Sequence, residues 1–219
     1  MEMDWKTNMA ELGGAFMVSW LVLGELPGVD DAGDATGSLL IAGLLLAVTM
    51  AAMAGAHVLP MFTWISAMTG DLQDTDAWIG NVMRLVMQVV GAGLALAMVG
   101  EGTVDAAGLT EIVAGVDGAA DTGGDEIVTM WAFDLWPMLM MVAAGALIGA
   151  IASRCDGWMT AFAVVAMAGA LGAGVTGADT MAAEVMGSGN MVEAASTWVL
   201  DGVVIGVGAL LGGMLEDQL

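Results

Sequence analysis

Polar side chains are rare inside the apolar stretches of this sequence, and the few that occur there could do chemistry. Glu11, Asp134 and Asp201 are carboxylic acids within apolar runs, and His57 is the single histidine. Acids at membrane depth often mark ion or proton paths, but they also serve as buried acceptors for backbone N–H groups. His57 could act as a pH gate, although a packed histidine bonded to backbone agrees with the sequence equally well.

Enzymatic and metal chemistry have little support in these residues. An intramembrane aspartyl enzyme would need Asp134 beside Asp179 or Asp201, and no nucleophile motif accompanies them. The single cysteine, Cys155, excludes an internal disulfide and a cysteine-based metal cage. The 21 methionines could form a Cu(I) path, but methionine more often fills gaps between packed helices. We therefore expect no enzyme activity, no metal site and no cofactor.

The composition indicates that helices in a membrane position these groups. The 219 residues are 58% hydrophobic and 13% charged, with a mean hydropathy of +0.85. Soluble domains are about 45–50% apolar and about 25% charged. Runs of about 20 apolar residues are long enough to cross a bilayer as helices. Six runs approach or exceed that length: Met9–Leu26, Ser38–Ala56, Trp78–Val99, Val128–Ala152, Met159–Thr176 and Ala194–Leu215.

The charge is strongly acidic, with 25 Asp and Glu against three Lys and Arg, for a net charge of −22. Such a surface repels nucleic acid and anionic lipid, so neither is an expected partner. With six spans, Lys6, Arg84 and Arg154 all fall on one side, which the positive-inside rule makes cytoplasmic. We expect both termini on that side, no cleavable signal peptide, and the acidic loops outside.

Two shorter apolar segments, 58–70 and 178–190, do not belong to the six runs, and each begins beside a Gly-Ala pair. Their length predicts re-entrant half-helices, which are tolerated where they line a cavity or are buried in protein. Asp134 follows Glu11 by 123 residues, and Gly177–Asp179 follows Gly55–His57 by 122 residues. These nearly equal offsets predict two repeated halves. We expect one domain, 1–219, whose halves 1–100 and 127–219 are joined by an acidic loop and inverted relative to each other.

Small residues inside the runs predict close contacts between neighbouring helices. The glycines expected to face a neighbour are Gly91, Gly145, Gly149, Gly202 and Gly206.

The order of several short motifs resembles the aquaporin (major intrinsic protein) family over nearly the whole chain. Glu11–Phe16 (ELGGAF) is similar to the family's E-F-L-G-T-F, and Gln88–Ala92 (QVVGA) to its Q-L-L-G-A. Gly55–Thr63 (GAHVLPMFT) resembles G-A-H-x-N-P-A-V-T. Val175–Gly177 (VTG), followed by Met181–Glu184 (MAAE), stands where the family has V-T-G followed by N-P-A-R.

The resemblance implies an all-α membrane protein with six transmembrane helices and two re-entrant half-helices. Its implied function is passive transport of water or a small neutral solute such as glycerol, by a homotetramer in the cell membrane. The resemblance places the selectivity filter at Leu39, Gly169, Ala178 and Glu184. It places the half-helix motifs at the pore centre on Leu59, Pro60, Met61, Met181, Ala182 and Ala183. It makes Gly55, Ala56 and His57 pore-lining and makes Glu11 and Asp134 buried structural acids, neither with an obvious basic partner.

The departures from the family fall on the implied pore chemistry. Leu59 and Met181 stand in place of its two asparagines, and Glu184 stands in place of its filter arginine. Apolar groups at the centre could plug the path, which leaves a non-conducting scaffold as one alternative. A glutamate attracts cations where an arginine repels them, which leaves a cation-permeable channel as another.

Overall fold

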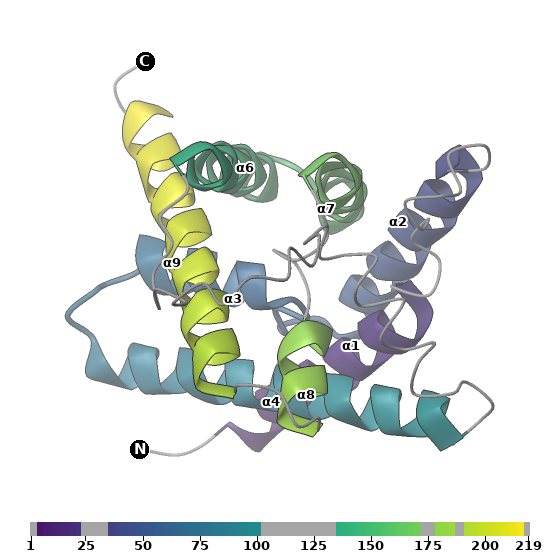
Figure 1. The fold of residues 1–219 in the computed structure, drawn as a ribbon. Coiled ribbons are helices and arrows are strands. Elements are labelled where there is room, and N and C mark those ends of the chain that lie inside the picture. The colour runs from purple at the N-terminus through teal and green to yellow at the C-terminus, as the bar shows by residue number, and fades with distance from the viewer. Residues whose placement is uncertain (1–3, 23–34, 102–134, 172–177, 187–190, 217–219) are drawn as a thin grey trace, which may run out of the picture.

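The computed structural model describes residues 4–22, 35–101, 135–171, 178–186 and 191–216, and all regular structure within these ranges is helical (Figure 1). Helix α1 (Trp5–Met17) is capped by Asp4, whose carboxylate accepts hydrogen bonds from the N–H groups of Lys6 and Thr7. It continues directly into a π-helical turn, η1 (Val18–Val22). The other helices are α2 (Ala35–Ala52), α3 (Pro60–Thr69), α4 (Thr75–Glu101), α6 (Leu135–Arg154), α7 (Gly157–Leu171), α8 (Asp179–Met186) and α9 (Met191–Glu216).

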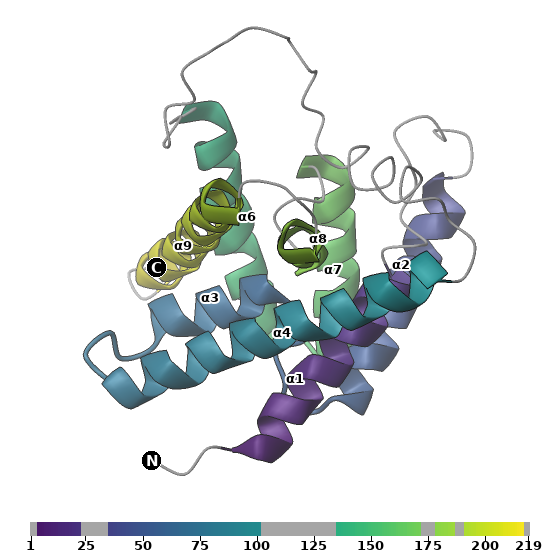
Figure 2. The ribbon, with the colours of Figure 1, turned by 60° about the horizontal axis from the view of Figure 1, so that its bottom comes forward.

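The helices pack in corresponding pairs in the two parts of the chain. The most extensive contacts join α1 to α4, α6 to α9 and α2 to α7. The two short helices cross between the parts, because α3 packs against α9 and α8 packs against α4. Helix α4 also contacts α3, so both short helices lie beside it (Figure 2).

Glycine allows the long pairs to approach closely. A Cβ added to Gly91 of α4 would collide with the carbonyl oxygen of Leu12 in α1. A Cβ added to Gly145 of α6 would likewise collide with the carbonyl oxygen of Ile205 in α9. The predicted contacts of these glycines are confirmed, as are those of Gly149, Gly202 and Gly206.

Much of the outer surface is apolar. On α4, six exposed residues follow a helical spacing of three or four: Ile79, Val82, Val86, Val90, Leu94 and Met98, here called the outer stripe. By length and composition, two of the described helices could cross a membrane, α4 over Thr75–Met98 and α9 over Ala194–Met214. The apolar segments Leu40–Ala52, Met138–Arg154 and Gly157–Met167 are shorter, and the six-span count stays a prediction.

The helix boundaries refine the sequence-based segments. The second apolar run was expected to continue to Ala56, but α2 ends at Ala52. Gly55 beyond it has a φ of 93°, a left-handed conformation that an α-helix does not contain. The first predicted short segment contains α3, which begins with Pro60 at its first position, where the missing N–H costs nothing. The second contains α8.

Candidate functional site

Glu11 is the centre of a polar cluster that joins three parts of the chain. Its side chain is 0% exposed, and each carboxylate oxygen accepts two hydrogen bonds. Oε1 accepts from the backbone N–H of His57 at 2.7 Å and from Arg84 Nη1 at 3.1 Å. Oε2 accepts from the backbone N–H of Val58 at 2.9 Å and from Gln88 Nε2 at 2.7 Å. The carboxylate therefore joins α1, α4 and the segment before α3.

Arg84 corrects the expectation that Glu11 has no basic partner. The two form an ion pair whose arginine side chain is 24% exposed while the glutamate is fully enclosed. Taking a carboxylate out of water is costly unless it is paired and its lone pairs are filled. Arg84 supplies the countercharge, and the three N–H donors from His57, Val58 and Gln88 satisfy the rest of the carboxylate.

Thr63 and Gln88 extend this cluster toward the first turn of α3. Gln88 Nε2 donates to Thr63 Oγ1 at 3.0 Å as well as to Glu11. The same hydroxyl oxygen lies 3.1 Å from Nδ1 of His57. His57 is thus held at both its backbone and its ring, but its partners are side chains, Glu11 and Thr63, instead of the backbone partner that was one expectation for it. Among the described residues, Gln88 Oε1 is buried without a hydrogen-bond partner.

The segment that carries His57 is strained. Val58 has a φ of 67°, and a β-branched residue rarely adopts this left-handed conformation. Strain of this kind costs about 1–3 kcal/mol and persists only where surrounding contacts impose it. Here the bond from Val58 N–H to Glu11 and the packing of its side chain against Gly14 supply those contacts. Gly55 is exposed and Ala56 and His57 are half-buried.

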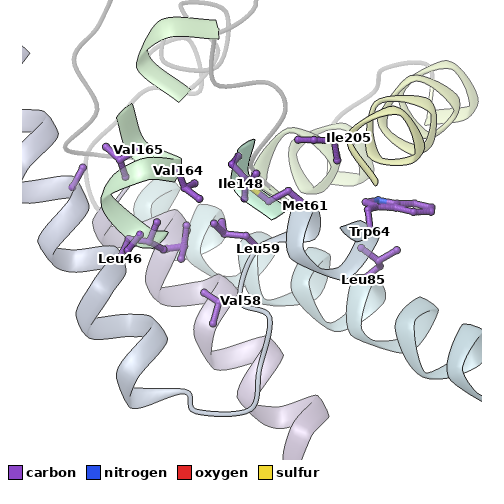
Figure 3. Packing of buried hydrophobic residues seen from close by; sticks show 13 residues of the cluster. Leu46, Val58, Leu59, Met61, Trp64, Leu85, Ile148, Val164, Val165 and Ile205 are labelled. Carbon is purple, nitrogen blue, oxygen red and sulfur yellow. The ribbon is translucent and has the colours of Figure 1, made fainter. Parts of the chain in front are cut away.

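The residues at the start of α3 lie in the hydrophobic core. Leu59 is the residue before the helix, and it makes no side-chain hydrogen bond to the helix N-terminus. Leu59 is 3% exposed and Met61 is 1% exposed. Figure 3 shows both side chains among apolar residues of other helices, including Ile148 of α6 and Val164 of α7. Pro60 between them is also buried.

The residues at α8 form a smaller contact with α4. Ala178 and Ala182 are buried in a cluster with Ala92 of α4. Met181, Ala183 and Glu184 are half-buried along the same short helix.

Some predicted positions fall outside the description. Leu39 and Gly169 belong to α2 and α7, but their surroundings lie outside what the structure describes. Asp134 precedes α6 and lies outside the described residues. Asp201 is half-buried in α9. Within the described ranges, no group of three His, Cys, Asp or Glu side chains could hold a metal ion.

Sequence reasoning assigned no site role to Arg84, Gln88 or Thr63. Arg84 served only as an indicator of topology, and the other two appeared only as letters of a motif. The spacing of α4 contained the missing signal. Arg84 is two residues from both Val82 and Val86, so at about 100° per residue it lies opposite the outer stripe. Gln88, one turn later, shares that inner side.

The comparisons add no family to this geometry: no family model matches the chain, and no curated protein or solved structure matches it.

Proposed function

We propose that the chain is a passive membrane channel, with six spanning helices and two re-entrant half-helices, for water or a small neutral solute such as glycerol. The observation that carries this proposal is the crossed packing of the two short helices. Helix α3 packs on α9, α8 packs on α4, and the pairs α1–α4 and α6–α9 correspond. An inverted repeat with broken helices is an architecture of transport proteins.

The polarity of the molecule supports a bilayer as its surroundings. Large apolar side chains are exposed along α2, α4 and α6, whereas Glu11, Gln88 and Thr63 are enclosed. Water around such a surface would be unfavourable, because exposed apolar area is disfavoured by about 25 cal/mol per Å². Lipid removes that penalty, and the enclosed carboxylate has its partners within the protein.

The experiment is stopped-flow osmotic shrinkage of proteoliposomes, compared with empty liposomes of the same size. Faster shrinkage with the protein is expected. The variant Glu184→Arg is expected to change the rate, and Asp156→Arg, an exposed acid in the loop between α6 and α7, serves as the matched control. Shrinkage no faster than that of empty liposomes, from protein shown to be folded, would reject the channel.

The burial of Leu59 and Met61 favours a second candidate, a non-conducting scaffold with a closed centre. Both side chains pack among residues of several helices instead of facing open space (Figure 3). Leu59→Ala separates the two functions. In a closed scaffold, wild-type protein gives no flux and this variant opens one. In a channel, wild-type protein already conducts.

A further inference from the structure

We propose that Arg84 determines charge selectivity in the pathway, by presenting its guanidinium to water at the end of the pathway that is bounded by residues 55–57. This inference rests on the proposed channel function and adds to it the residue that rejects cations. Glu11 is the positioning residue, because it holds the guanidinium in place from the protein side.

The first step is that Arg84 faces neither lipid nor a sealed core. It lies on the side of α4 opposite the outer stripe, the side that also carries Gln88 and the close contact of Gly91. Its side chain is nevertheless 24% exposed. A charged group at membrane depth faces the bundle interior or a water-filled cavity. Within the proposed channel, the exposed part of Arg84 therefore borders the water of the pathway.

The second step is that this water borders the segment before α3. His57 N–H and Arg84 Nη1 bond to the same oxygen of Glu11, at 2.7 and 3.1 Å. Those two nitrogens are therefore no more than about 6 Å apart, the sum of two hydrogen-bond lengths. Gly55 is exposed and His57 is half-buried, so this segment also reaches the surface.

The third step concerns the sign of the field. Glu11 is enclosed and its charge is shared among four donors, whereas Arg84 lies between Glu11 and the water. A cation approaching from the water meets the positive end of this ion pair first, and Coulomb interactions weaken with distance. The pair therefore repels cations and tolerates neutral solutes. This effect opposes the attraction expected of Glu184.

The test places a thiol at this position and changes its charge. The background is Cys155→Ser, because Cys155 is exposed and is the only native thiol. Arg84→Cys is then treated with methanethiosulfonate reagents that add either an ammonium or a sulfonate group. Val86→Cys is the matched control, since Val86 is 47% exposed but belongs to the outer stripe. Water flux and rubidium uptake are measured in the same proteoliposomes.

The introduced thiol at position 84 is expected to react at least about ten times faster than the one at position 86. The reagents react with the thiolate, which forms where the thiol meets water and not where it faces lipid. Rubidium uptake is expected to rise at least about tenfold with the sulfonate and to stay low with the ammonium. Arg84→Lys, which keeps the charge, should retain low uptake and covers the case in which the cysteine variant does not fold.

The two proposals fail separately. Equal rubidium uptake with either reagent, or equal thiol reactivity at positions 84 and 86, overturns the role of Arg84 while water flux stands. No water flux in folded wild-type protein overturns the channel and, with it, this role.

Discussion

Replacing Glu11 with glutamine should destabilise the protein strongly although the side chain keeps its size. The amide retains one acceptor oxygen and replaces the other with an N–H₂ group. Two of the four donors that now bond to the carboxylate therefore lose their acceptor. A buried donor without a partner costs about 1–3 kcal/mol, so the expected loss is about 2–6 kcal/mol in the free energy of unfolding.

This loss is measured by unfolding in mixed detergent and dodecyl sulfate micelles, followed by fluorescence of the eight tryptophans. Glu184→Gln is the matched control, because Glu184 is only half-buried, and its effect should stay within about 0.5 kcal/mol. Adding Arg84→Gln to Glu11→Gln completes a double-mutant cycle, in which a coupling of about 0.5–3 kcal/mol is expected. A loss below about 1 kcal/mol for Glu11→Gln would refute the view that this carboxylate holds the strained segment.

Three further predictions concern glycine contacts, backbone strain and helix capping. Gly91→Ala should lower the free energy of unfolding by about 1–3 kcal/mol, because the added Cβ collides with α1. Gly80 lies in open space on the same helix, so Gly80→Ala should raise the free energy of unfolding by about 0.5–1 kcal/mol. Equal effects of the two substitutions would contradict the packing of α4 on α1. Gly55→Ala should cost about 1–2 kcal/mol through its φ of 93°, with no clash, and a neutral effect would argue against this backbone. The hydrogen bond from the Thr7 hydroxyl lowers the pKa of Asp4 in the folded protein below its ordinary value of 3.8. The stability that this cap contributes is therefore present above pH 3.8 and is lost as the pH falls through the lowered pKa of the folded state. Asp4→Asn should remove this pH dependence when stability is measured in an acid titration.

Local signals in the sequence located the short helices. Pro60 at the first position of α3 and the Gly-Ala pairs marked where these helices begin, because proline and glycine act through backbone geometry at a single residue. The end of α2 was placed four residues too late, since Met53 to Ala56 are as apolar or small as the helix before them. Composition does not reveal the left-handed Gly55 that follows.

The ion pair needed a different kind of information. Arg84 and Glu11 are far apart in the sequence, and their meeting depends on how α1 and α4 are rotated against each other. The outer stripe fixes the rotation of α4 and could have placed Arg84 on the inner side. The rotation of α1 is set instead by its contact with α4, where Gly91 lies against Leu12. That contact joins distant parts of the sequence and is known only from the structure.

The crossed packing of α3 also has a consequence for synthesis. Trp64 and Met68 of α3 pack against Gly202 and Gly206, which belong to the last described helix. Chains emerge from the ribosome N-terminus first, so α3 is made long before the surface that covers it. A nascent chain stalled before α9 should therefore keep the Trp64 indole accessible to quenchers, and the release of α9 should protect it. The packing of α3 therefore depends on α9, a helix translated more than 120 residues later.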